Sequence, residues 1–242
     1  PAYVVAEYPS GKIIAGKNID KKRPIASFVK VLVGYESVQN GLDQKKDSIY
    51  STNKDGAEGY NLWLSNGDKL LNKDILNTML IGSYNNISRL TVHAAGLTDK
   101  QMVSKINDRL KEWGVENSKV ADVTGLDENN ISTARDLLKI FTYSTKIFDI
   151  KNILGKKQHD FASKNNSRHF SIKHSTKLNF DNPSYKIISS KTGYTDEAKS
   201  VLFLLIKSKK TNKKYTVITL GNPDYTNRFK EPDRIARWAA QQ

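Results

Sequence analysis

Residues 186–221 read KIISSKTGYTDEAKSVLFLLIKSKKTNKKYTVITLG. Three runs rich in apolar and β-branched residues lie in this stretch, at 186–194, 199–208 and 214–221, and polar, turn-forming residues separate them. Runs of this length and composition are typical of strands joined by short connections. The stretch therefore predicts three consecutive strands that pair antiparallel in one sheet.

The two ends of the chain supply further elements of this sheet layer. AYVVAEY (2–8) and KIIAGKN (12–18) are β-rich runs, and the turn signal PSG lies between them, so they predict an N-terminal hairpin. The last residues, EPDRIARWAAQQ (231–242), have a helical pattern with Pro232 in the first turn. The predicted fold class is α/β, with a five-stranded, mostly antiparallel sheet flanked by helices.

The middle of the chain is mostly helical by its apolar spacing. Apolar residues recur every three to four positions in 72–83, 99–115 and 132–148. A further helix is predicted from Ser27 to the stop signal at Gly41, and it is apolar on nearly every side, which is typical of a buried, central helix. We therefore expect a helical insert between the two sets of strands.

The 242 residues are enough for one large globular unit or two interleaved ones. We expect a sheet subdomain of residues 1–26 plus 186–242 and a mainly helical subdomain of residues 27–185, together forming one catalytic unit. No run of 18 apolar residues is present, so no transmembrane segment is expected in this chain. The absence of cysteine excludes disulfides, thiol catalysis and cysteine-based zinc sites.

The net charge of +14 raises the question of a polyanionic partner. The lysines are scattered, and only KSKKTNKK (207–214) is a cluster, at the tip of a predicted hairpin. Nucleic-acid binders concentrate charge and interleave it with aromatic residues, and this pattern is missing. We predict no nucleic-acid partner and a loose association with anionic wall polymers.

The stretch PIASFVK (24–30) places Ser27 and Lys30 one helical turn apart, on one face. A serine hydroxyl is a weak nucleophile until a base removes its proton, and a lysine whose pKa is lowered by burial can be that base. Ser51 and Lys54 have the same spacing, but they lie in a polar loop where a solvated turn is expected.

Two further motifs accompany this pair. Ser83-Tyr84-Asn85 follows an apolar helix, and Lys191-Thr192-Gly193 lies on a predicted strand. Serine and asparagine two apart also occur at 163–165, so that pattern alone is weak evidence. The order S-x-x-K, S-x-N, K-T-G is nearly the set found in penicillin-recognising enzymes.

With these motifs the chain resembles the D-alanyl-D-alanine carboxypeptidases, the low-molecular-mass penicillin-binding proteins, over essentially its whole length. The resemblance extends to the segments SGKIIAGKNIDKKRPIASFVK (10–30), DVTGLDENNISTARDL (122–137), HSTKL (174–178), SKTGYTDEA (190–198) and NRFKEPDRIARW (227–238). The family's fold, a sheet sandwiched by helices plus an all-helical insert, agrees with the layout predicted above.

The resemblance implies roles for individual residues. The catalytic residues would be Ser27 as nucleophile, Lys30 as its base and Ser83 as proton relay to the leaving amine. The implied substrate-binding residues are Asn85, Lys191, Thr192, Gly193, Tyr194 and Arg228. The backbone N–H groups of Ser27 and Tyr194 would form the oxyanion hole, and Arg228 would grip the terminal carboxylate. No metal and no cofactor is implied.

The implied function is removal of the terminal D-Ala from peptidoglycan stem peptides, through an acyl-enzyme on Ser27 that β-lactams also form. The protein would then be exported and act in the cell envelope. Endopeptidase action on cross-links, a β-lactamase-like hydrolase and a non-catalytic penicillin sensor are the alternatives. The only string similar to the E-x-x-L-N loop of class A β-lactamases is DILN (74–77), which comes before Ser83 and inside a predicted helix. A sensor would not need the complete set of leaving-group residues.

Some positions depart from the family pattern. The family usually has glycine shortly before K-T-G and an Ala-Gly pair after it, whereas this chain has Ser189-Ser190 and Ala198-Lys199. Tyr84 stands where a small residue is common. These departures affect the expected shape of the pocket and leave the reacting groups intact.

Overall fold

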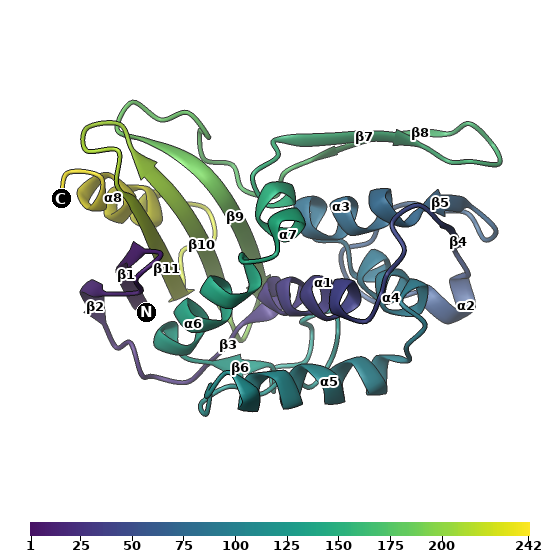
Figure 1. Cartoon of the computed structure of the whole chain (residues 1–242), viewed down its shortest axis with the longest axis horizontal. Coiled ribbons are helices and arrows are strands. Elements are labelled where there is room, and N and C mark those ends of the chain that lie inside the picture. Colours follow the sequence, from purple (N-terminus) through teal and green to yellow (C-terminus); the bar gives the residue numbers. More distant parts are fainter.

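The computed structural model describes residues 1–242, apart from the side chain of Phe148. Its main feature is a five-stranded antiparallel sheet in the order β2-β1-β11-β10-β9 (Figure 1). The strands are β1 (Ala2–Tyr8), β2 (Ile13–Lys17), β9 (Tyr185–Thr195), β10 (Lys199–Ser208) and β11 (Lys214–Asn222). The prediction that both ends of the chain combine in one sheet is confirmed.

Helices cover both faces of this sheet. Leu202 and Leu204 of β10 pack in a cluster with Ile235 of α8 (Lys230–Ala239) on one face. Phe203, which points to the other face, packs against Phe141 of α6 (Ala134–Ser144) and against Phe28. Because β10 is buried on both faces, its sequence is a continuous apolar run rather than an alternating one.

The helix predicted from Ser27 is present at the centre of the molecule. A 3₁₀ turn, η1 (Ala26–Phe28), leads into α1 (Val29–Gln39). Nearly every residue of α1 from Val29 to Ser37 is buried, as expected for a helix that is apolar on all sides. The first turn of this helix is therefore held rigidly between the sheet and the other helices.

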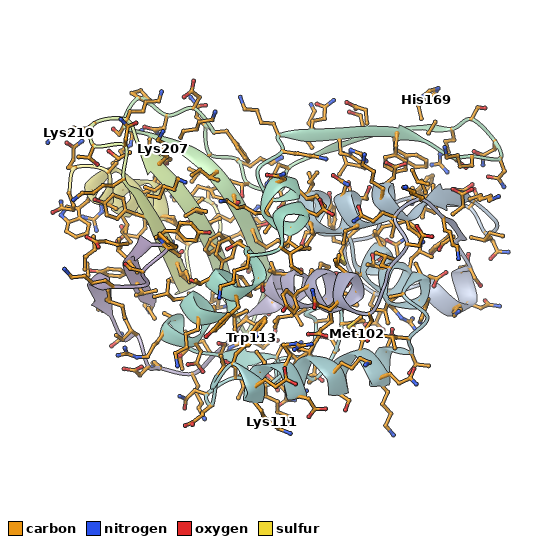
Figure 2. The ribbon with its side chains drawn as sticks, in the orientation of Figure 1. Met102, Lys111, Trp113, His169, Lys207 and Lys210 are labelled. Carbon is orange, nitrogen blue, oxygen red and sulfur yellow. The ribbon has the colours of Figure 1, made fainter. Side chains whose placement is uncertain are left out.

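The rest of the insert is largely helical, as predicted. Its helices are α2 (Thr52–Asp55), α3 (Asn72–Gly82), α4 (Asn85–Ala94), α5 (Asp99–Glu112) and α7 (Phe148–Ile153). In α5, Met102 is buried and Lys111 points into solvent, in keeping with its amphipathic pattern (Figure 2). Two short strand pairs accompany these helices, β3 (Arg23–Pro24) with β6 (Ile131–Ser132), and β4 (Asp47–Ile49) with β5 (Lys69–Leu71).

One hairpin inside the insert was not predicted. Strands β7 (Gln158–Ala162) and β8 (His169–Lys173) pair antiparallel and extend along α3 (Figure 1). The rings of Phe161 and Phe170 stack across the two strands with centroids 5.0 Å apart. The division into subdomains 1–26 plus 186–242 and 27–185 stays a prediction. Among the described residues, no helix is long and apolar enough to span a membrane.

Candidate active site

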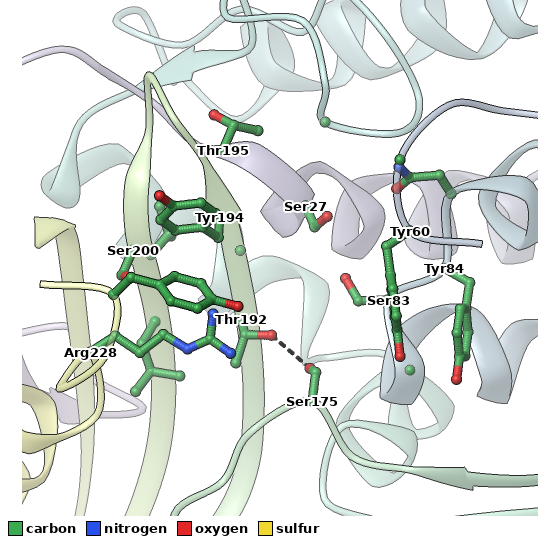
Figure 3. A pocket seen from close by; sticks show the side chains of 18 of the residues that line it. Ser27, Tyr60, Ser83, Tyr84, Ser175, Thr192, Tyr194, Thr195, Ser200 and Arg228 are labelled. Carbon is green, nitrogen blue, oxygen red and sulfur yellow. Dashed lines mark hydrogen bonds between the residues drawn. The ribbon is translucent and has the colours of Figure 1, made fainter. Parts of the chain in front are cut away.

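A cleft of about 810 Å³ separates the outer strand β9 from the helical part of the molecule. All three motifs meet in it (Figure 3). The predicted site residues that line it are Ser27, Ser83, Asn85, Thr192, Gly193, Tyr194 and Arg228. The two remaining ones, Lys30 and Lys191, lie beneath its surface with 0% of their area exposed.

Lys30 makes direct contact with the hydroxyl of Ser27. Its ammonium nitrogen lies 2.8 Å from Ser27 Oγ and 2.8 Å from Asn85 Oδ1, and it also donates to the carbonyl of Thr124. Burial lowers the pKa of Lys30 to about 7, although the nearby Asp122 acts in the opposite direction. A lysine with this pKa is neutral often enough near neutral pH to accept the serine proton.

The backbone around Ser27 is tightly packed by two glycines. A Cβ atom at Gly193 would lie 3.1 Å from the backbone nitrogen of Ser27, so strand β9 approaches Ser27 as closely as a residue without a side chain allows. Gly125 packs against the same peptide from the loop between α5 and β6, with a φ of 88° that favours glycine. Ala26, directly before the nucleophile, also has a positive φ of 47°. Gly125 lies within segment 122–137, and the sequence alone indicates no role for it.

The second motif lies where α3 ends and α4 begins. Ser83 terminates α3 in a left-handed conformation, with a φ of 70°. Lys191 Nζ donates to Ser83 Oγ at 2.6 Å and to its neighbour's carbonyl, Thr192 O, at 2.7 Å. Burial and the proximity of Lys30 lower the pKa of Lys191 well below its usual value. The motifs S-x-N and K-T-G are thus linked by one buried hydrogen bond.

The loop before α3 holds Asn85 in place. Asn85 donates from Nδ2 to Glu58 O at 2.9 Å and from its backbone nitrogen to Tyr60 O at 2.8 Å. Tyr84, one of the departures from the family pattern, stacks on Tyr60 with ring centroids 4.6 Å apart. This pair of rings forms the wall of the cleft that faces β9 (Figure 3).

Strand β9 is the edge of the sheet, and part of its outer side is open to the cleft. Ser190 N donates to Leu154 O at 2.9 Å, away from the neighbouring strand β10. Because the peptide groups of an antiparallel strand alternate between its two sides, the N–H groups of Thr192 and Tyr194 also face outward. The Tyr194 N–H therefore points into the cleft on the side where the Ser27 backbone nitrogen lies.

A cationic group lies at the Thr192 end of the cleft. The Arg228 guanidinium is 4.2 Å from the ring centroid of Tyr225 and 5.0 Å from that of Phe229, and it points towards Thr192 (Figure 3). It forms no ion pair with any acidic side chain of the described chain. Thr192 Oγ1 donates to Ser175 Oγ at 2.6 Å. Ser175, which lies in the quoted segment 174–178, was not predicted as a site residue.

The rival motifs lie elsewhere. Ser51 precedes the short helix α2, whose Lys54 is exposed and bonds to Ser51 only through the backbone, from its N–H to Ser51 O at 3.1 Å, and neither residue lines the cleft. Asp74, the start of the string DILN, lies 2.8 Å from His159 Nε2, outside the cleft. Within the described part of the chain, no group of three or more acidic or histidine side chains is arranged to hold a metal ion.

The positions that depart from the family pattern all have identifiable contacts. Ser189 Oγ donates to Lys151 O at 2.9 Å, and Ser190 Oγ donates to Phe203 O at 3.0 Å, so both hydroxyls are used inside the fold. Lys199, at the second position of the usual Ala-Gly pair, has a φ of 55°, in the left-handed region that favours glycine. Lys199 thus has the backbone conformation that favours glycine, although the residue itself is a lysine.

The chain is similar to known proteins over most of its length. The family model for D-alanyl-D-alanine carboxypeptidases, peptidase family S11, matches residues 1–223. A D-alanyl-D-alanine endopeptidase of Haemophilus influenzae is 26% identical, over 91% of this chain and 75% of that protein. The D-alanyl-D-alanine carboxypeptidase DacF of Bacillus subtilis is also 26% identical, over 90% of this chain and 56% of that protein.

Solved structures of similar fold confirm the predicted fold class. A D-alanyl-D-alanine carboxypeptidase of Mycobacterium tuberculosis superposes with a TM-score of 0.85 at 22% identity, covering 99% of this chain and 90% of the other. The Streptomyces K15 DD-transpeptidase superposes with a TM-score of 0.88 at 19% identity, covering 99% and 96%. At these identities the superpositions establish a shared fold and nothing further.

Proposed function

Because this chain belongs to the D-alanyl-D-alanine carboxypeptidase family, we propose that it cleaves the peptide bond before a terminal D-Ala through an acyl-enzyme on Ser27. The observation that carries this proposal is the 2.8 Å contact between Ser27 Oγ and the fully buried amine of Lys30. The natural substrates are peptidoglycan stem peptides that end in D-Ala-D-Ala, and the place of action is the cell envelope.

The first step is attack of Ser27 Oγ on the carbonyl carbon of the penultimate D-Ala. Lys30, neutral because burial lowers its pKa, takes the hydroxyl proton as the C–O bond forms. The developing oxyanion lies between the N–H groups of Ser27 and Tyr194, which are fixed in place before the substrate arrives. Collapse of the tetrahedral intermediate breaks the C–N bond and leaves the acyl-enzyme.

The leaving amine must receive a proton in that collapse. Ser83 Oγ accepts a hydrogen bond from Lys191, so its own hydroxyl hydrogen is free to point at the leaving nitrogen. The proton that Lys30 took from Ser27 replaces the one that Ser83 gives to the leaving nitrogen, so the step is balanced. Water then hydrolyses the ester and restores Ser27.

Binding of the terminal carboxylate selects the scissile bond. Arg228 offers a planar guanidinium, which can donate two parallel hydrogen bonds to one carboxylate, and Thr192 adds a hydroxyl. The proposed grip requires a free chain end, which is what distinguishes a carboxypeptidase substrate from a continuing peptide. The relatives include proteins named endopeptidase and proteins named carboxypeptidase.

The alternatives are less well supported by the site. A β-lactamase-like hydrolase would need a carboxylate to activate the deacylating water, and Asp74 of the DILN string lies outside the cleft. We therefore expect β-lactams to acylate Ser27 and to remain bound. A silent sensor would not need Ser83 and Lys191 hydrogen-bonded beside the nucleophile. The +14 charge supports the further proposal of loose, salt-sensitive binding to anionic wall polymers.

Intact-mass spectrometry with benzylpenicillin, followed by measurement of D-Ala release from a stem pentapeptide, tests the proposal. We expect one persistent adduct on the peptide that contains Ser27, and D-Ala release that benzylpenicillin abolishes. The Ser27→Ala variant should lose both, whereas Ser51→Ala, at the rival motif, should keep both. An adduct on Ser51, or an adduct that disappears within seconds, would overturn the assignment.

A further inference from the structure

Strand β8 and the turn after it present four polar side chains to the cleft in alternation. These are Ser171, Lys173, Ser175 and Lys177, here called the serine–lysine track. The three residues between them are buried at 2–4% exposure, so the alternation directs every second side chain into the cleft. Both lysines of the track are exposed.

The track passes the end of the cleft where the terminal carboxylate is bound. Ser175, in its middle, accepts the 2.6 Å hydrogen bond from Thr192 Oγ1. Lys173 and Lys177 are each two residues from Ser175, so their Cα atoms lie within about 7 Å of that of Ser175. Since Thr192 and Arg228 hold the leaving residue in the proposed mechanism, the two lysines flank the leaving-group side of the scissile bond.

The charges in the cleft are distributed unevenly. Lys173 and Lys177 form no ion pair with any residue of the described chain, and they add to the guanidinium of Arg228 at one end. The acidic side chains lining the cleft, Asp196 and Glu197, lie in the turn after β9, where Asp196 accepts a hydrogen bond from the Tyr194 hydroxyl. In the proposed function, Arg228 and Thr192 bind the single terminal carboxylate. The ammonium groups of Lys173 and Lys177 are therefore available to bind another anionic group.

We propose that the serine–lysine track binds a second carboxylate, carried by the leaving residue or by the peptide attached to it. The proposal rests on the function proposed above and specifies which leaving groups this site prefers. The preferred substrate has an anionic leaving side. The hydroxyl of Ser175, midway along the chain between the two lysines, adds a hydrogen-bond donor to the same carboxylate.

Three peptides that differ only in the leaving residue test this proposal: acetyl-L-Lys-D-Ala followed by D-Ala, D-Glu or D-Gln. D-Glu and D-Gln have the same shape and the same terminal carboxylate, and only D-Glu has the second one. We expect kcat/KM for D-Glu to exceed that for D-Gln by about 3–10-fold at low salt, since exposed ion pairs are individually weak. The ratio should fall towards one as ionic strength rises.

The double variant Lys173→Gln/Lys177→Gln should bring the D-Glu to D-Gln ratio to within about twofold. The matched control, Lys164→Gln/Lys210→Gln, removes the same charge from residues outside the cleft and should keep the wild-type ratio. A wild-type ratio near one, with D-Ala still released from the first peptide, overturns this inference and leaves the proposed function standing. Failure to cleave any of the three peptides, with no penicillin adduct on Ser27, overturns both.

The track could in principle be a site for an anionic wall polymer and not for a peptide carboxylate. Inhibition by an inorganic polyphosphate of about ten units distinguishes these two ligands. We expect it to inhibit wild type and the double variant equally, because its binding would be diffuse. Inhibition that needs both lysines, in a protein without preference between D-Glu and D-Gln, would assign the track to a polymer and overturn the proposal.

Discussion

Gly125 is in contact with the peptide bond that joins Ala26 to Ser27. A Cβ atom at Gly125 would lie 2.7 Å from the Ser27 backbone nitrogen and closer still to the carbonyl of Ala26. That nitrogen is one of the two proposed oxyanion donors, so the loop after Thr124 determines both where the nucleophile lies and where its N–H points. Thr124 itself accepts a hydrogen bond from Lys30, and the same loop therefore contacts the nucleophile and its base.

The Gly125→Ala variant should lose at least about 100-fold in the rate of β-lactam acylation, the size of effect that removal of one oxyanion donor produces. The reason is displacement of the Ala26–Ser27 peptide, in addition to the strain of a φ of 88°. Gly114→Ala is the matched control, because Gly114 also has a positive φ, of 62°, and has open space around its Cα. Both variants should lose stability, by about 1–2 kcal/mol. Equal acylation rates in the two variants would contradict the role assigned to Gly125.

The acylation rate should depend on pH through Lys30. The base must be neutral to accept a proton, so with a pKa of about 7 the rate should fall about tenfold per unit below pH 7 and level off above it. The measurement is the rate of penicillin adduct formation between pH 5 and 9. A rate that is flat across this range would show that Lys30 is not the titrating base.

Replacement of Lys30 should remove this pH dependence together with the activity. We expect Lys30→Ala to fold and to lose about 10²–10⁴-fold in acylation rate, as is typical when a general base is removed. Lys30→Arg should also be inactive at every pH tested, because a guanidinium does not deprotonate in this range. Lys54→Ala, in the exposed rival motif, should retain the wild-type rate.

Arg228→Ala should weaken turnover of peptides ending in D-Ala-D-Ala by about 1.5–3 kcal/mol in kcat/KM, the contribution of a charged hydrogen-bonding group. Substrates whose terminal carboxylate is amidated should change little, because they do not offer the partner of the guanidinium. Arg234→Ala is the control, since Arg234 lies on α8 and is paired with Glu231. Equal losses for free and amidated substrates would place the carboxylate site elsewhere.

Lys199→Gly should stabilise the protein by about 0.5–1 kcal/mol, although it removes a side chain. Lys199 has a φ of 55°, which costs a residue with a Cβ atom about 1–2 kcal/mol, and the greater freedom of glycine in the unfolded chain offsets part of this gain. Urea denaturation measures the difference. Lys210→Gly loses the same charge at a turn residue without a positive φ and should give no increase in the free energy of unfolding.

The sequence was sufficient to predict the parts of the fold with strong periodicity. The sheet followed from the long apolar runs at 199–208 and 214–221, which correspond to β10 and β11 within one residue. The helix at Ser27 was predictable because it is apolar on every side, which also indicated that Lys30 would be buried. The three motifs were predictable as a set because they occur in order on elements whose types could be inferred.

The parts that were missed depend on contacts between distant segments. The β7–β8 hairpin has five-residue strands with few apolar residues, and its stability comes from the Phe161–Phe170 pair and from packing on α3, which local patterns do not contain. Ser175 became a site residue only through its hydrogen bond to Thr192, which is 17 positions away. The only indication for Gly125 in the sequence was its place in a segment that resembles the family. Its contact with the Ala26–Ser27 peptide follows from the three-dimensional structure alone.

The outer edge of β9 also has a consequence for self-association. An unpaired strand edge is a template on which another chain can add a strand, and proteins usually cover or charge such edges. Here the backbone carbonyls of Phe180 and Leu154 accept hydrogen bonds from the N–H groups of Ile187 and Ser190. The part of the β9 edge before Thr192 is therefore already paired within the protein. The stretch left open, from Thr192 to Tyr194, lines the cleft and has only three residues, which is too short for a second sheet to dock. It admits the end of a single extended peptide, so the feature that restricts the substrate also protects the protein from aggregating through its active site.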